Sequence, residues 1–224
     1  MRPMAMTLAD DESIKNVALY VSTFKEKAQP AITQTAKIST AEPASVSVTS
    51  STENGKTLYG VCASCHGADG AGNKALNAPR ISGQKAWYTA RQLANFKSGI
   101  RGSHEEDIYG QQMRPMALTL ANDQAVADVA AYIDTLKGSA SASTIQGDTA
   151  AGKTSYSVCA SCHGANGEGN KELNAPKIAG QQDWYIVRQL QNFKKGVRGA
   201  DSNDSYGQQM RPMAMILADD AAIN

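Results

Sequence analysis

Cys62-Ala63-Ser64-Cys65-His66 decides the fold of this chain, and the same five residues return as Cys159-Ala160-Ser161-Cys162-His163. Cys-x-x-Cys-His is the motif at which c-type haem is attached to a protein. Two cysteines three residues apart lie on one side of a helical turn, where both sulfurs can reach the two vinyl groups of one porphyrin. The histidine that follows is carried beneath the ring, where its imidazole can bind the iron. The motif therefore predicts two covalently bound haem c groups.

Two other uses of a Cys-x-x-Cys pair fit less well. A structural zinc site needs four ligands, but the four cysteines all lie in the two motifs and His104 is the one further histidine. A thioredoxin-like redox pair is typical of a βαβ pattern and needs no histidine after the second cysteine. The identical motif with matching flanks favours haem.

Charge and apolar patterning argue against some classes of protein. Lys and Arg number 22 and Asp and Glu number 21, so the charge does not indicate nucleic-acid binding. No apolar run reaches the roughly 18 residues of a membrane-spanning helix, and residues 1–25 lack the apolar core of a signal peptide. Thioether attachment of this kind takes place outside the bacterial cytoplasm. We therefore expect a periplasmic protein whose signal peptide lies upstream of this sequence.

The chain repeats itself at an offset of 97 residues, at which 55–120 match 152–217 without a gap. Repetition of this kind indicates tandem domains. The shared blocks are Asn77-Ala78-Pro79 with Asn174-Ala175-Pro176, Trp87-Tyr88 with Trp184-Tyr185, Arg91-Gln92-Leu93 with Arg188-Gln189-Leu190, and Tyr109 to Met116 with Tyr206 to Met213.

A third, partial copy opens the chain, because Met1 to Ala5 match Met113 to Ala117. Stretches rich in Ala, Ser, Thr and Pro with little apolar periodicity are typical of linkers. The predicted organisation is 1–27 as the C-terminal half of an incomplete haem domain, 28–51 as a linker, 52–137 as a complete domain, 138–148 as a shorter linker, and 149–224 as a domain lacking its C-terminal helix.

Two explanations of the partial copy stay open. The chain is a window of a longer tandem array, or residues 1–27 of one subunit complete 149–224 of the next in a head-to-tail swap. A swap would supply the methionine segment twice, since Met210 to Met213 repeat it near the other end. This redundancy favours the window, and a native mass near that of the chain plus two haems would contradict it.

The remaining patterns are helical. Residues 86–98 and 123–137 carry apolar side chains at helical spacing, as do Ile14, Val17, Val21 and Phe24 in the opening segment. No stretch shows sustained strand alternation. The predicted fold is all-α, with tandem small domains that each wrap one haem.

The group opposite the histidine decides what a haem protein does. Methionine paired with histidine occurs in cytochromes c and raises the potential. Each complete unit offers two candidates, Met113 and Met116 in one and Met210 and Met213 in the other, on a predicted loop stiffened by proline. One methionine of each pair is expected to pack as an apolar residue.

Together these motifs resemble class I c-type cytochromes, and their tandem arrangement resembles the dihaem cytochrome c4 family. Besides Cys-x-x-Cys-His, the resemblance is carried by Ala-Pro-Arg/Lys-Ile-Ser/Ala-Gly-Gln, a Tyr-x-x-x-Gln helix and the methionine segment, and it covers 52–137 and 149–224. It implies that the ligand lies about seven residues before Leu120 or Leu217. That position selects Met113 and Met210 over Met116 and Met213, and assigns Met1 to a missing upstream haem.

The resemblance also implies residues around the ligands. The carbonyls of Pro79 and Pro176 are expected to orient the histidines. Residues expected to meet the haem propionates are Arg80, Lys177, Trp87, Trp184, Arg91 and Arg188, although the arginines could equally lie on solvated helix faces. His104, which is aspartate in the other copy, is expected on the surface, and 105–107 are expected to form a solvated loop.

These expectations favour an electron carrier and not an enzyme. Its partners would be periplasmic redox proteins or a membrane-bound oxidase or reductase, with self-association possible through 1–27 and the incomplete C-terminal domain. One alternative is a repeat unit of a polymeric haem wire. The other is a dihaem peroxidase, which would need an iron that can open a coordination site, whereas both copies carry the same methionine segment.

Overall fold

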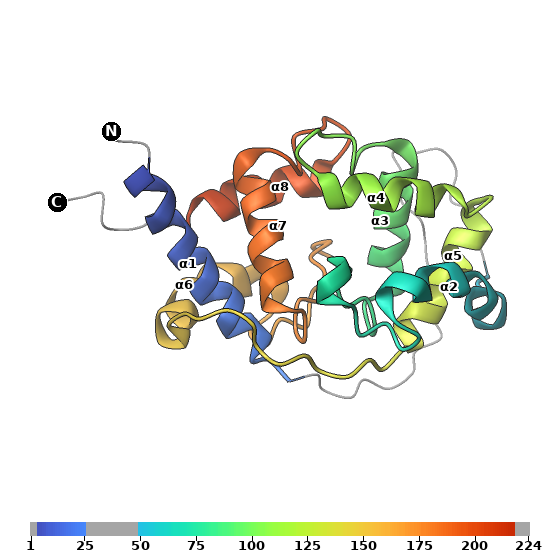
Figure 1. Ribbon diagram of the computed structural model, residues 1–224, viewed down its shortest axis with the longest axis horizontal. Coiled ribbons are helices and arrows are strands. Elements are labelled where there is room, and N and C mark those ends of the chain that lie inside the picture. Colours follow the sequence, from blue (N-terminus) through green and yellow to red (C-terminus); the bar gives the residue numbers. More distant parts are fainter. Residues whose placement is uncertain (1–3, 26–48, 218–224) are drawn as a thin grey trace. The chain divides into compact units, whose positions relative to one another are not determined.

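The computed structural model describes residues 4–25 and 49–217, with side chains described from residue 12 onward (Figure 1). The described residues are helical and contain no strand, only the isolated bridges Asn73–Ala78 and Asn170–Ala175. This confirms the all-α prediction. The elements are α1 (Met4–Ser22), α2 (Thr52–His66), the 3₁₀ turn η1 (Lys74–Leu76), α3 (Ala86–Ser98), α4 (Ile108–Leu118), α5 (Asp123–Thr135), α6 (Thr149–His163), α7 (Asp183–Lys195) and α8 (Ser205–Met215).

The chain divides into two compact units that interleave in sequence. One, here called the α2 unit, is Ala28–Ala140, and the other, the α6 unit, combines Met1–Lys27 with Ser141–Asn224. The α6 unit is therefore assembled from two segments that are separated by the whole of the α2 unit.

The core of the α2 unit forms where α5 crosses α2 and α3. Val126, Val129 and Ile133 on α5 are 0–2% exposed and pack with Tyr59 of α2 and Phe96 of α3. The helix predicted at 86–98 is confirmed, and the one predicted at 123–137 is confirmed with its end at Thr135.

A glycine lets α2 and α5 approach each other. A Cβ atom on Gly55 would lie 2.0 Å from the carbonyl oxygen of Asp128, which no real side chain tolerates. The same contact occurs in the α6 unit, where a Cβ on Gly152 would lie 2.1 Å from the carbonyl oxygen of Asn16 on α1. In both units the two crossing helices are thus in backbone contact at the glycine.

In the α6 unit α1 takes the place that α5 has in the α2 unit (Figure 1). Ile14, Val17 and Val21 are 0–2% exposed and pack with Tyr156 of α6 and Ile186 of α7. They stand at the positions that Val126, Val129 and Ile133 hold in the aligned copy. The sequence predicted a domain at 149–224 without its C-terminal helix, and the structure packs α1 of the same chain against it.

The methionine segments, predicted as loops, are helices. α4 and α8 each contain the proline within the helix, at Pro115 and Pro212. Each begins at an aspartate whose carboxylate accepts a hydrogen bond from a backbone N–H of the first turn, at 3.1 Å for Asp107 and 3.0 Å for Asp204. Asp107 is 6% exposed, so the prediction of a solvated loop was wrong for this residue, because its side chain caps a helix.

The predicted linkers differ in what can be described. Residues 28–48 of the first linker lie outside the described part of the chain. The second is anchored at both ends: the Gly138 carbonyl accepts a bond from Arg80, and the Asp183 carboxylate accepts bonds from Ser143, Thr144 and Ile145. These bonds hold the pKa of Asp183 below its ordinary value even though burial alone would raise it.

Candidate functional site

The two motif histidines are buried at the ends of α2 and α6. His66 and His163 are each 6% exposed. The Nδ1–H of His66 donates to the Pro79 carbonyl at 2.7 Å, and that of His163 donates to the Pro176 carbonyl at 2.8 Å. A carbonyl only accepts hydrogen bonds, so Nδ1 carries the proton in both rings, and the lone pair of Nε2 is left for a metal ion.

Burial also sets the protonation state of these histidines. It lowers the pKa of both imidazoles, and the hydrogen bond to the proline carbonyl offsets this only in part. The neutral imidazole is the form that binds metal ions. Both histidines are therefore held in the orientation and the charge state that a metal ligand needs.

The loop after each histidine is built on glycine. Gly72 has φ 86°. It passes so close to the returning part of the loop that a Cβ atom would lie 2.6 Å from the backbone nitrogen of Arg80. The loop folds back there so that Asn73 bridges Ala78 and the Pro79 carbonyl reaches the imidazole. A tyrosine one helical turn before the motif, Tyr59, donates to the Gly67 carbonyl at 2.7 Å. The α6 unit repeats this arrangement with Tyr156, Gly164, Gly169 and Pro176.

The structure separates the two methionines of each pair by burial. Met113 is half-buried and packs against the core of the α2 unit, whereas Met116 is 39% exposed. In the α6 unit Met210 is half-buried and Met213 is 37% exposed. Met1 lies outside the described residues.

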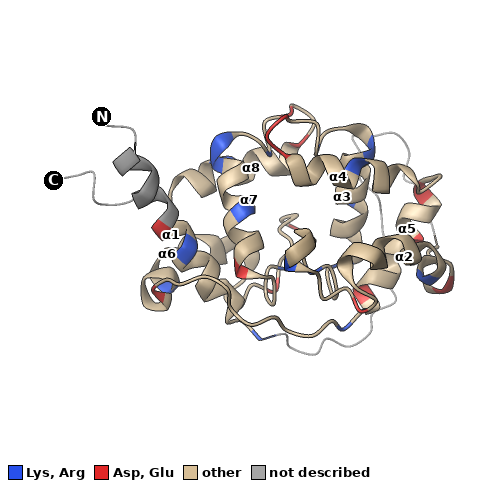
Figure 2. Cartoon of the chain, in the orientation of Figure 1, with Lys and Arg blue, Asp and Glu red and all other residues tan. Residues whose placement is uncertain are grey.

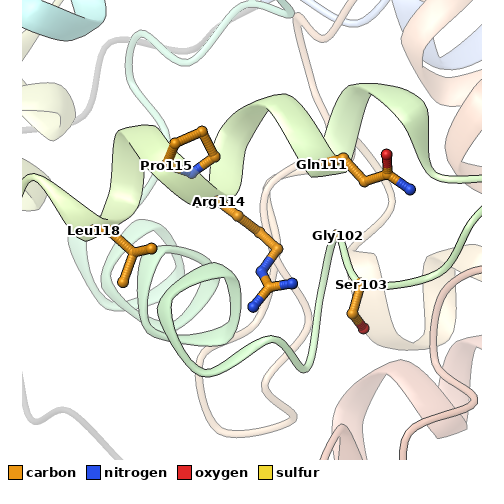
Figure 3. Close-up of a pocket in the computed structure, with 6 residues that line it drawn as sticks. All are labelled: Gly102, Ser103, Gln111, Arg114, Pro115 and Leu118. Atoms are coloured by element: carbon orange, nitrogen blue, oxygen red, sulfur yellow. The ribbon is translucent and has the colours of Figure 1, made fainter.

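An arginine that the sequence reasoning missed holds each methionine helix in place. Arg114 directly follows Met113 and lies between α4 and the loop after α3, beside a hollow of about 390 Å³ (Figure 3). A Cβ on Gly99 would lie 3.2 Å from its guanidinium, and one on Gly102 would lie 3.1 Å from its Cγ. The guanidinium thus lies at the C-terminal end of α3, where a positive charge is favourable. Arg211 makes the same contact at Gly196, and the repeated Met-Arg-Pro-Met was the available signal.

The residues predicted to bind the propionates differ in burial and in the groups that they contact. Arg80 is 4% exposed and donates from Nε to the Ser82 hydroxyl, besides its bond to Gly138. Lys177, at the same position in the α6 unit, is half-buried. On α3 the Arg91 guanidinium stacks 5.0 Å from the Trp87 ring, and on α7 Arg188 stacks 4.8 Å from Trp184. His104 is exposed.

The side chains present fit a haem in each unit. None of the four motif cysteines is in a disulfide; Cys62 and Cys159 are half-buried against the core, and Cys65 and Cys162 are exposed. Each unit therefore offers two sulfurs for thioether bonds, a neutral imidazole with a free Nε2, and a methionine thioether on α4 or α8. This donor set is that of a c-type haem with histidine and methionine ligands.

Comparison with known proteins points the same way. The family model for Cytochrome c matches residues 52–137 and 149–224. Cytochrome c4 of Azotobacter vinelandii is 34% identical over 183 residues, which cover 76% of this chain and 84% of that protein. The thiosulfate dehydrogenase electron acceptor of Stutzerimonas stutzeri strain A1501 is 32% identical over 164 residues, covering 68% of this chain and 72% of that protein.

A solved structure matches as well. Reduced recombinant cytochrome c4 from Pseudomonas stutzeri superposes with a TM-score of 0.59 at 31% identity, covering 74% of this chain and 90% of that one. Each of the two ranges matched by the family model contains one complete Cys-x-x-Cys-His motif.

Proposed function

We propose, from the premise that this chain belongs to the cytochrome c family and is a dihaem class I cytochrome of the cytochrome c4 kind, that it carries electrons between redox proteins of the periplasm. It binds two covalent haem c groups, one at Cys62 and Cys65 and one at Cys159 and Cys162. The proposed haem domains span 52–137 and 149–224, the second of them closed by α1.

The observation that carries this function is that both units present the same ligands in the same state. In each, the chain holds a neutral histidine by a proline carbonyl and places a half-buried methionine on a later helix, α4 or α8. We assign His66 with Met113 to one iron and His163 with Met210 to the other. Bound haem would supply reversible one-electron chemistry, and these two residue pairs would hold its iron.

The remaining site residues support this role by position. Pro79 and Pro176 fix the tautomer of each histidine, which maintains its basicity as a ligand. Trp87 with Arg91, and Trp184 with Arg188, present a cation stacked on an indole ring, and we propose that they face the propionates together with Lys177. We propose that Arg80 meets the propionates as well, with its guanidinium held in place by the bonds that it donates to Ser82 and Gly138.

Two haems in one chain allow transfer between domains. Gly138 is anchored in the α2 unit, and Ser141, whose hydroxyl accepts a bond from Gln182, is anchored in the α6 unit, so two residues lie between the anchors. Fully extended, the chain from one anchor to the other spans at most roughly 11 Å. We propose that this tether serves electron passage from one unit to the other.

The partners follow from the same relatives. A thiosulfate dehydrogenase electron acceptor is among them, so we propose an electron-donating dehydrogenase and an accepting oxidase or reductase. No described helix is both long and apolar enough to cross a membrane. Charges of both signs are scattered along the described helices and loops (Figure 2), so partner docking would not depend on one strong field. The relatives are electron-transfer proteins, which favours neither the polymeric wire nor the peroxidase.

The test replaces each proposed ligand and its neighbour in the holoprotein. Met113→Ala and Met210→Ala should each convert one of two low-spin haems to a site open on one side and lower its potential. Met116→Ala and Met213→Ala, one helical turn away, are the matched controls and should leave both spectra unchanged. Spin state by electron paramagnetic resonance and potential by redox titration give the two readouts.

The wild type should take up two electrons per chain, exchange them with a thiosulfate dehydrogenase, and turn over no peroxide. A high-spin haem in the resting wild type, or loss of a low-spin signal in a control variant, would contradict the assignment. Monodisperse particles in light scattering would separate a carrier from a wire, and a stable dimer would support the self-association through residues 1–27 that the sequence left open.

A further inference from the structure

The helix that ends in Cys-x-x-Cys-His, α2 or α6, is here called the motif helix of its unit. The helix that crosses it is called the closing helix, and the place where they cross is called the junction. We propose that each haem unit selects its closing helix by a rule of one carboxylate per junction, so that α1 closes the α6 unit and α5 closes the α2 unit. The residues that carry this rule are Asp128 and Ser51 in one junction and Asn16 and Asp148 in the other.

The apolar stripe alone does not discriminate. Both closing helices bury the same stripe, Ile14, Val17 and Val21 on α1 and Val126, Val129 and Ile133 on α5. Both cross the motif helix at a glycine with nearly the same close approach, 2.0 Å at Gly55 and 2.1 Å at Gly152. Either helix would therefore fit either unit along this stripe. Beside the stripe the units differ at Phe24, which packs on the Tyr156 ring where the other unit has Leu136, and in the polar groups that carry the rule.

In the α2 unit the carboxylate belongs to the closing helix. Asp128 is 2% exposed and accepts from the Ser51 N–H at 2.7 Å, from the Asn54 side chain at 2.6 Å and from Gln124 at 2.7 Å. Ser51 caps α2 with an uncharged hydroxyl. The buried carboxylate thus meets three donors and no second acid among these contacts.

In the α6 unit the carboxylate belongs to the motif helix. Asp148 stands at the position of Ser51 and caps α6 by accepting from the Ala150 and Ala151 N–H groups at 2.7 and 3.2 Å. Its own N–H donates at 2.7 Å to the Oδ1 of Asn16, which stands at the position of Asp128 and is 8% exposed. Ala151, at the position of Asn54, offers no side-chain donor.

Exchanging the helices would break the rule in both units. α5 on α6 would bring the Asp128 carboxylate beside that of Asp148 and take away the Asn54 donor, so two acids would share a site that favours one. α1 on α2 would leave Asn16 beside Ser51 with no carboxylate, and the Asn54 amide would lose a charged acceptor. The matched pairs are therefore preferred over the crossed ones.

The test moves the carboxylates in the full-length holoprotein and measures amide hydrogen exchange of peptides from α1 and α5. Asn16→Asp should speed exchange in α1 about tenfold, since Asp148 is exposed and solvent screens part of the repulsion, and should leave α5 unchanged. Adding Asp148→Ser should restore α1 protection. The triple change Asn16→Asp, Asp148→Ser and Ala151→Asn rebuilds the α2 junction and should reach at least wild-type protection.

The α2 unit provides the mirror experiment and keeps the test decisive if the first variant fails to fold. Ser51→Asp should speed exchange in α5 and not in α1, and adding Asp128→Asn should reverse that effect. The rule is overturned if Asn16→Asp has the same effect with and without Asp148, or if Ser51→Asp leaves α5 protection unchanged.

Discussion

Replacing Gly152 by alanine should loosen the α6 unit, because its backbone lies against α1. The new Cβ atom would lie 2.1 Å from the Asn16 carbonyl oxygen, 2.6 Å from the carbonyl carbon and 3.0 Å from the Tyr20 Cβ. Ordinary contact begins at 3.4 Å, so α1 would have to move by about 1.3 Å. A backbone carbonyl cannot rotate away as a side chain can, and a helix moves as a body.

The expected loss follows from two opposing effects. Overpacking of a buried contact costs about 1–3 kcal/mol, and the rigid carbonyl places this case near the upper end. Alanine in place of glycine in a helix returns about 1 kcal/mol. The net loss is about 2 kcal/mol, which corresponds to a fall of roughly 8 °C in the melting temperature of a domain of this size.

The assay is thermal unfolding of the holoprotein followed by circular dichroism and by the absorbance of the haems. Gly60→Ala is the control, since a Cβ at Gly60 meets nothing within 4 Å, and it should leave stability unchanged or raise it by up to about 1 kcal/mol. Gly55→Ala should shift the loss to the α2 unit. A Gly152→Ala protein that melts at or above the wild-type temperature would refute the close crossing of α1 and α6.

Three further results are expected. Hydrogen bonds from Asn54, Ser51 and Gln124 outweigh burial and hold the pKa of Asp128 below its ordinary 3.8. The stability that Asp128 gives the α2 unit is therefore complete above that value and is lost as the pH falls through the folded pKa. Thermal melts at a series of acidic pH values should show this loss, and Asp128→Asn should remove that part of the pH dependence. Tyr59→Phe should cost about 1 kcal/mol by leaving the Gly67 carbonyl without its 2.7 Å bond, measured by the same melts, and an unchanged melt would mean that water replaces the hydroxyl. Ten Gly and Ser residues inserted between Ser139 and Ala140 should slow electron exchange between the haems roughly tenfold, as effective concentration falls with tether length, and unchanged flash-reduction kinetics would contradict a role for the tether.

The helical periodicity of the sequence was sufficient where one apolar face decides the structure. Residues 86–98 form the predicted helix because Trp87, Ala90 and Leu93 recur on one side and Gly99 ends it with φ 81°. The haem attachment motif was equally readable, since it needs five consecutive residues and no tertiary information.

The methionine segment was missed as a helix for a physical reason. Its proline and glycine suggested a loop, while the groups that stabilise the helix lie outside the local pattern. Asp107 caps its first turn, and Arg114 packs onto the loop after α3. Such contacts depend on the turn that brings α3 and α4 together, which no periodicity encodes.

The place of α1 could not be predicted from its own apolar stripe. Ile14, Val17 and Val21 match the stripe of α5, so sequence similarity identified the kind of helix but not the unit it covers. Its packing against Tyr156 and Ile186 and the bond from Asp148 to Asn16 connect it to the α6 unit.

The interleaving of the two units has a consequence for biosynthesis. α1 is made before α6, so its docking surface emerges only after the whole α2 unit has been made, a delay on the order of ten seconds at bacterial elongation rates. During that interval the stripe of Ile14, Val17 and Val21 has no surface of its own unit to cover it. The nascent chain thus carries an uncovered amphipathic helix until α6 has been made, and a holding chaperone would find its binding site there.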